Sequence, residues 1–451
     1  MLALFLLTLA GLEAGPHAVG VKVQDGVDYS RSWRSPTLWP ARPNPQPFGV
    51  RTRLVVWYPA EPPAAAAPRL THLDYVTFAE PGPQTPQLRE RAAREHASLL
   101  QRWRHVGIVE LTAEQARRTL DAPSIATRDT PPKPGKYPVV ILGNPHYLRT
   151  TAEFLASHGY LVVSAGHLGD PRTERPHGRD AWNPELWVRA LEWGLGQLAA
   201  EPLADLSRLA AIGHGGGGAN AMFLAMRNTA VRAVAGIDAG IFSNRGSYRD
   251  LPFVTPTHLR VPMLTILTPD ARRGQDLYEA EFPRFRYSER FEVLLKSDKV
   301  RHHDLSDFGR PVSAFLGIRG EAQEEVNAAY AATQTLLLRF LDRELKGNPR
   351  SRVSGDTPVY VVRRHPSVDP APTAAELMEA LRELPQGTVV AALKQALLED
   401  PEAGLFRENE LLAAANQARS EGFADAAAAL LDMARQLYPA SDQVKNAVSQ
   451  R

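Results

Sequence analysis

The amino-acid sequence predicts an α/β protein in which a doubly wound, mostly parallel sheet is followed by a small all-helical region. Between residues 51 and 346, short apolar segments alternate with segments of helical pattern, which is typical of parallel strands joined by helices. A run of glycines at 213–218 separates an apolar strand from a helical segment. After residue 350 the composition changes to one rich in Ala, Leu and Glu, which favours helices.

Strands are expected where short apolar runs end at glycine, proline or polar clusters. The first two, in "GPHAVGV" and "RTRLVVWYPA", precede a stretch of helical pattern over residues 84–120. Later strands are expected at 139–143, 160–165, 208–213, 231–238, 262–268 and 291–297. Helices are expected between and after them, at 151–159, 183–199, 219–228 and 325–345. In the second of these, apolar residues recur at the i, i+3, i+4 and i+7 spacing of an amphipathic helix.

The chain divides into four parts by composition. Residues 1–14 contain an apolar run that we interpret as a possible signal segment, and export to the periplasm or the extracellular space is then expected. Otherwise the segment is a short buried or frayed N-terminal piece of a cytoplasmic protein. This run is too short to cross a membrane as a helix, and no integral span is expected. The α/β domain is assigned to 15–350, a Pro-containing linker to 351–372 and the helical region to 373–451.

The helical region contains one clear helical hairpin. The stretch "ENELLAAANQARSEGFADAAAALLDMARQLYPAS" predicts a helix, a turn at Gly422, a second helix and a stop at Pro439. This hairpin resembles a single tetratricopeptide-type unit, with Ala-rich inner faces and a Tyr-Pro exit. One copy does not make a solenoid, so we expect a small appendage that binds a protein partner or packs against its own domain.

Composition excludes several classes of function. The net charge is +2, and the basic residues are dispersed among carboxylates, so no nucleic-acid partner is expected. The chain has no cysteine, which excludes a thiol nucleophile, a disulfide framework and a Cys-based zinc site.

The glycine run matches two different kinds of site. Gly213–Gly218 fits the Gly-x-Gly-x-x-Gly cradle of a dinucleotide-binding domain, and Asp238 follows at a suitable spacing. Such a cradle normally follows the first strand of its domain, whereas earlier strands precede this one. The alternative is the nucleophile elbow of a serine hydrolase, a sharp turn between a strand and a helix.

The hydrolase interpretation also accounts for residues further along the chain. In that fold the catalytic residues follow in the order nucleophile, acid, histidine. Asp238 ends the next expected strand, and "VRHHDLSDF" follows a later one. Together with "GKYPVVIL" and "LASHGYLVVSAGH", these segments resemble the platelet-activating-factor acetylhydrolases and dienelactone-hydrolase-like esterases of the α/β-hydrolase fold, over residues 15–346. The resemblance implies that Asp238 is the acid and His302 the base.

The sequence departs from that resemblance at two positions of the active site. The elbow of such enzymes reads Gly-His-Ser-x-Gly-Gly, so Gly215 occupies the place of the nucleophile, whose removal typically costs on the order of 10⁶ in rate. In the oxyanion loop Pro145 occupies a donor position, and proline has no N–H to donate. The second oxyanion donor is expected to be the N–H of Gly216.

Two interpretations of the remaining pair stay open. Asp238 and His302 form a retained structural pair, or His302 activates a water that performs slow hydrolysis. His303 takes the role of His302 if the loop is shifted by one residue. Five histidines are expected near this edge of the sheet, at positions 146, 167, 214, 302 and 303. Their spacing does not indicate a metal site, and neither a metal nor a cofactor is expected.

The sequence therefore favours a catalytically degenerate, esterase-like protein, a pseudohydrolase with a binding or scaffolding role. The expected ligand is a small acyl ester or a lipid-like molecule. The alternative is a weak or altered carboxylic-ester hydrolase that acts on short acyl esters through Asp238, His302 and water. Dinucleotide binding at Gly213–Gly218 is a remote third interpretation.

Overall fold

The computed structural model of the chain describes residues 12–30, 37–43, 49–63, 67–78, 80, 85–101, 111–144, 148–167, 184–242, 248, 251, 254–272, 275–307, 319–401 and 403–449. It divides into two compact units, Met1–Pro366 and Ser367–Arg451. Among these described residues, no helix combines the length and the apolar character needed to cross a membrane.

The first unit is built on an eleven-stranded sheet in the order β13-β12-β11-β10-β9-β7-β8-β4-β1-β6-β5. Its strands are β1 (Ala18–Asp28), β4 (Val50–Ala60), β5 (Arg69–Thr71), β6 (Pro123–Arg128), β7 (Tyr137–Leu142), β8 (Leu161–His167), β9 (Ala204–His214), β10 (Val231–Ile237), β11 (Met263–Leu267), β12 (Arg290–Leu295) and β13 (Tyr360–His365). A separate two-stranded sheet pairs β2 (Thr37–Leu38) with β3 (Arg42–Pro43).

The sheet is mixed and mostly parallel, as the sequence predicts. The six strands from β8 to β12 in the sheet order run parallel to their neighbours. At one side β4 runs antiparallel to both β8 and β1, and at the other β13 runs antiparallel to β12. Because the C-terminal ends of adjacent parallel strands meet at one edge, the residues that follow β9, β10, β11 and β12 are brought together there.

Helices connect the strands and continue beyond them. They are α2 (His72–Phe78), α3 (Pro86–Gln101), α4 (Ala113–Leu120), α5 (Arg149–Ser157), α6 (Pro184–Leu198), α7 (Gly216–Arg227), α8 (Pro269–Arg272), α9 (Gln275–Glu281), α11 (Gln323–Lys346), α12 (Ala374–Glu383), α13 (Gln386–Glu399), α14 (Glu408–Ser420), α15 (Ala424–Leu437) and α16 (Asp442–Ser449). Short 3₁₀ turns are η3 (Gly240–Phe242), η4 (Pro256–His258), η5 (Phe282–Phe285), η6 (His302–Leu305), η7 (Gly320–Ala322) and η8 (Gly404–Phe406).

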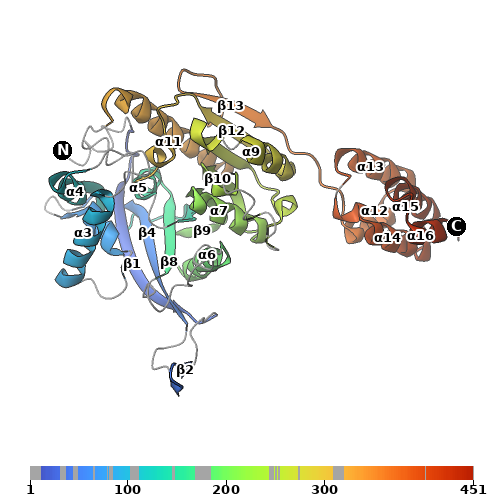
Figure 1. The fold of residues 1–451 in the computed structure, drawn as a ribbon, viewed down its shortest axis with the longest axis horizontal. Coiled ribbons are helices and arrows are strands. Elements are labelled where there is room, and N and C mark those ends of the chain that lie inside the picture. Colours follow the sequence, from blue (N-terminus) through green and yellow to red (C-terminus); the bar gives the residue numbers. More distant parts are fainter. Residues whose placement is uncertain are drawn as a thin grey trace. The chain divides into compact units, whose positions relative to one another are not determined.

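Helices cover both faces of the sheet (Figure 1), which makes the fold doubly wound. Along β7, Val140 and Leu142 point into the core that α5 and α11 cover, whereas Val139 and Ile141 point into the core that α6 and α7 cover. Successive side chains of a strand alternate between its faces, so a strand buried on both sides is apolar throughout. This double burial is why the central strands were recognisable as continuous apolar runs.

The second unit consists of α12 to α16 and η8. Its core contains at least one buried residue from each helix: Leu377, Leu393, Leu411, Leu430 and Val444. Between α14 and α15, Gly422 has a φ of +87°, a backbone conformation that glycine adopts without strain and that ends the first helix sharply.

The segment 351–372 differs from the expected linker, because it contains the strand β13. Pro358 and Pro366 suggested an irregular segment, but both lie outside the strand and leave the N–H groups of Tyr360–His365 in place. A proline that flanks an edge strand does not interrupt it. Only the residues after β13 connect the two units.

Candidate active site

The glycine turn is a sharp connection between β9 and α7. β9 ends at His214, α7 begins at Gly216, and Gly215 between them has φ +55° and ψ −125°. The Gly215 N–H donates to the carbonyl of Ile237 at 2.9 Å, and its carbonyl accepts from the N–H of Gly240 at 2.7 Å. The positive φ favours glycine. These bonds hold the backbone of the turn against the end of β10.

Close packing explains the glycines on either side of this position. A Cβ atom on Gly213 would lie 2.1 Å from the carbonyl oxygen of Gly217, and one on Gly218 would lie 2.8 Å from the Cβ of Ala239. Only glycine lets α7 approach the strands so closely. Gly216 is different, since a Cβ there would meet nothing within 4 Å. Packing therefore accounts for Gly213 and Gly218 without a bound phosphate.

Asp238 follows β10 directly and is buried, with 2% of its surface exposed. Its carboxylate accepts two hydrogen bonds from Thr268, one from the backbone N–H to Oδ1 at 2.7 Å and one from the hydroxyl to Oδ2 at 2.8 Å. Its φ of +44° is one that Asp tolerates better than most residues. Thr268, which directly follows β11, was not recognised from the sequence; the one signal was a polar residue at the end of an apolar strand.

His302 lies on η6, in the loop that follows β12. Its Nδ1 lies 3.1 Å from Oδ2 of Asp238, and its side chain is 38% exposed. The carboxylate accepts the Nδ1–H, so Nε2 carries the lone pair of the neutral ring. Nε2 lies 3.1 Å from the position that a Cβ atom would take on Gly215. The structure thus brings Gly215, Asp238 and His302 together at one edge of the sheet.

Two further histidines surround this pair. The rings of His214 and His302 are inclined at 31° with centroids 4.1 Å apart, and Nε2 of His214 lies 2.8 Å from the carbonyl oxygen of His302. Because a carbonyl only accepts, His214 donates this hydrogen bond. Burial lowers the pKa of His214 well below its ordinary value, and the neighbouring His302 and His303 add to this effect. Burial, followed by the charge of His302, lowers the pKa of His303 to about 4.

Two acidic residues hold the loop of His302 in place. Asp304 accepts hydrogen bonds from the guanidinium of Arg319 at 2.9 Å and from the backbone N–H of Arg301 at 2.9 Å. Asp307 accepts from the backbone N–H groups of Arg149 and Thr150, at the start of α5. Since α5 follows the expected oxyanion loop, Asp307 connects the histidine loop to that part of the site.

Of the two positions expected to form the oxyanion site, the structure describes the one at Gly216. Gly216 is the first residue of α7, where backbone N–H groups have no acceptor within the helix and are oriented toward the helix N-terminus. Pro145 and His146 lie outside the described residues. His167 is the last residue of β8. No cluster of histidine and carboxylate side chains suited to a metal ion occurs in the described part of the chain.

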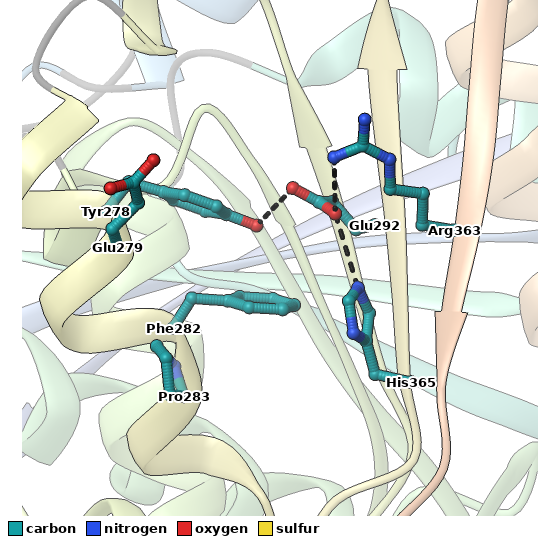
Figure 2. Close-up of a pocket in the computed structure, with 7 residues that line it drawn as sticks. All are labelled: Tyr278, Glu279, Phe282, Pro283, Glu292, Arg363 and His365. Carbon is teal, nitrogen blue, oxygen red and sulfur yellow. Dashed lines mark hydrogen bonds and ion pairs between the residues drawn. The ribbon is translucent and has the colours of Figure 1, made fainter.

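Away from this site, a cavity of about 210 Å³ lies between α9, η5 and the strands β12 and β13. Figure 2 shows the carboxylate of Glu292 at its centre, with Tyr278 on one side and Arg363 and His365 on the other. The Tyr278 hydroxyl donates to Glu292 at 2.9 Å, and Nε2 of His365 lies 3.3 Å from it. Arg363 is opposite Glu292 in the register of the two strands. These contacts attach β13 to the edge of the sheet.

Comparisons with known proteins agree with the topology. No protein-family model matches this chain, and no curated protein sequence matches it. Among solved structures, the chain is similar to a ferulic acid esterase from Streptomyces cinnamoneus, with a TM-score of 0.53 and 18% sequence identity. The similarity covers 78% of this chain and 98% of the esterase. At this identity the likeness concerns the fold alone: the chain shares a mixed, mostly parallel α/β architecture with an esterase.

Proposed function

We propose that this chain is a pseudohydrolase: an esterase-like protein that binds a small acyl ester or a lipid-like ligand at the elbow and does not form an acyl-serine. The observation that carries the proposal is Gly215. It lies in the sharp turn between β9 and α7, close to Nε2 of His302, and has no side chain that attacks a carbonyl. The replacement of a serine at this position, and membership of the platelet-activating-factor acetylhydrolase or dienelactone-hydrolase-like group, are part of the proposal.

The proposal extends to the surroundings of the site. Pro145, aligned with an oxyanion donor, supplies no N–H, which removes a second contribution to catalysis. The helices of the second unit, with the hairpin of α14 and α15, suit a tetratricopeptide-like role in binding a protein partner. Export, with residues 1–14 as the signal segment, fits a protein that binds such ligands outside the cytoplasm.

A second candidate function is slow hydrolysis of short acyl esters by a water molecule. The observation in its favour is the hydrogen bond between His302 and Asp238, which keeps the Nε2 lone pair directed toward the place where a nucleophile belongs. Dinucleotide binding is less favoured, because close packing already accounts for Gly213 and Gly218. A rise in the unfolding temperature with NAD or NADP would support dinucleotide binding.

The test compares the natural chain with Gly215→Ser and with Gly215→Ser combined with Pro145→Gly. We expect that a fluorophosphonate probe does not label the natural chain and that the chain does not hydrolyse a short alkyl ester. It should bind the methyl ketone analogue of that ester in calorimetry. The variants should gain labelling at residue 215, and the double variant should gain turnover.

Gly216→Ser is the matched control, because it adds the same hydroxyl one residue away, where the side chain meets open space. Labelling of the natural chain would contradict the loss of serine catalysis, and failure to bind the ketone would contradict the binding role. Turnover of the alkyl ester by the natural chain, lost on His302→Ala, would favour the water mechanism instead.

A further inference from the structure

The imidazole of His302 is held in one orientation by three neighbours. Oδ2 of Asp238 lies 3.1 Å from Nδ1, and Thr268 in turn donates to both oxygens of that carboxylate. His214 lies against the ring and donates a hydrogen bond to the His302 carbonyl. In a ring held in this way, the Nε2 lone pair keeps one orientation. The ring therefore loses no further rotational freedom when a substrate binds.

The Nε2 atom lies next to the space that the side chain of a nucleophile at residue 215 would fill. Nε2 and Cε1 of His302 lie 3.1 and 3.2 Å from the position of a Cβ on Gly215, and glycine puts no atom there. A substrate carbonyl therefore approaches Nε2 more closely than a serine would permit. The ring is 38% exposed, so a ligand reaches it from solvent.

The N-terminus of α7 lies beside the same space. Gly216 is the first residue of this helix of 12 residues, and it directly follows Gly215. Its N–H suits a negative charge that develops on the oxygen of an attacked carbonyl. Nucleophile, orienting carboxylate and oxyanion donor are thus present together although the serine is not.

We propose that His302 is itself a nucleophile, and that its Nε2 accepts the acyl group of activated acyl donors such as aryl esters. The proposal rests on the absence of serine catalysis proposed above, and it adds a reaction that a binding role alone does not require. Histidine is among the side chains that form covalent intermediates with acyl groups.

The reaction balances without any further reagent. The Nε2 lone pair forms a bond to the carbonyl carbon, and the bond from that carbon to the aryl oxygen breaks, with its electron pair leaving on the aryl oxide. The Nδ1 proton is shared with Asp238 and is lost to solvent, which leaves a neutral N-acyl imidazole. Water then attacks the acyl carbon, the carbon–nitrogen bond breaks, and a carboxylic acid and the original imidazole are released.

The same chemistry defines the substrate class. In a serine hydrolase the histidine gives a proton to the leaving group, but a ring whose Nε2 attacks has no proton to give from that atom. The leaving group must therefore depart as a stable anion. Aryl esters meet this condition and alkyl esters do not, which separates this activity from the ester hydrolysis tested above.

The experiment uses the full natural chain and p-nitrophenyl acetate. We expect a burst of nitrophenolate equal to the enzyme concentration and, in rapidly quenched samples, an acetyl group on the peptide that contains His302. Asp238→Asn should slow the burst by about 10²-fold or more, the scale of a positioned acid–base partner. His258→Gln, at an exposed histidine outside the site, is the control and should react like the natural chain.

Other outcomes overturn the proposal. Acetyl groups spread over many histidines, or a burst that Asp238→Asn leaves unchanged, would show ordinary surface reactivity. A burst that survives His302→Gln would assign the nucleophile elsewhere. Circular dichroism of each variant shows whether it is folded. The ketone-binding and fluorophosphonate results test the proposed function independently, so failure of one proposal is distinguishable from failure of the other.

Discussion

Nε2 of His302 lies 3.1 Å from the position that a Cβ atom would take on Gly215, closer than nine in ten real Cβ contacts. A side chain at residue 215 therefore requires the ring to move by a few tenths of an ångström and must also adopt a φ of +55°. At Gly216 neither condition applies. The two adjacent glycines of this turn thus differ in how well they accommodate a side chain.

This difference predicts opposite effects for the same substitution. Gly215→Ala should destabilise the chain by about 1–3 kcal/mol, the cost of a strained backbone. Gly216→Ala should stabilise it by about 0.4–1 kcal/mol, because alanine restricts the unfolded chain without strain in the native helix. Denaturant unfolding of the two variants, with the natural chain alongside, measures both. Equal effects would mean that a side chain at residue 215 causes no backbone strain.

Two half-buried histidines, His96 and His303, predict that stability falls in mild acid. The pKa of His303 is lowered to about 4, first by burial and then by His302, and that of His96 to about 4, first by burial and then by Arg149. Between their unfolded value near 6.5 and pH 4, the unfolded state binds protons that the native state does not. Their contribution to stability is therefore complete above pH 6.5 and is lost as the pH falls toward 4, by at most about 1.4 kcal/mol per pH unit for each group.

Unfolding midpoints measured from pH 7 to 4 test this prediction. His96→Gln should flatten the slope, because it removes one group that gains a proton on unfolding. The exposed His258 provides the control, and His258→Gln should leave the slope as it is. A stability that is constant over this range would contradict the lowered pKa of both histidines.

The attachment of β13 depends on Glu292 more than on Arg363. Glu292 is nearly buried, with 5% of its side chain exposed, and accepts from the Tyr278 hydroxyl, whereas Arg363 is 55% exposed and lies 3.8 Å away (Figure 2). Glu292→Ala should therefore cost about 1–3 kcal/mol by removing the carboxylate that the buried Tyr278 hydroxyl donates to. Arg363→Ala should cost less than about 1 kcal/mol, as exposed ion pairs do.

Hydrogen exchange checks this prediction locally. In Glu292→Ala, the amides of Tyr360–His365 should exchange faster, while those of the central strands change little. Arg363→Ala should show near-natural protection in the same peptide. If both variants lose protection equally, the ion pair of Arg363 with Glu292 accounts for the whole effect, and the other contacts of Glu292 add nothing.

The sequence predicted the parts of this structure that burial determines. Central strands such as β7 and β10 are buried on both faces, so their apolar runs were visible without a structure. β13 was missed because its apolar residues, Tyr360–Val362, are few, are followed by Arg363 and Arg364, and lie between Pro358 and Pro366. At the site, Asp238 was recognisable from its place after an apolar strand. Thr268 was not, because a hydrogen bond between two strand ends depends on the sheet order, which local patterns do not contain.

A substitution can also remove the N–H of Gly216, the expected oxyanion donor, without removing any side chain of the site. Proline at this position removes the donor, and the first residue of a helix is where proline fits best. Gly215 lacks the Cβ with which a following proline clashes. We expect Gly216→Pro to release nitrophenolate from p-nitrophenyl acetate about 10²–10³ times more slowly than Gly216→Ala, the scale of one oxyanion donor. Gly216→Ala is the matched comparison, because it alters the same carbon and keeps the N–H. Equal rates in two folded variants would mean that the carbonyl oxygen does not lie at the start of α7, and the donor would then belong to another segment of the site.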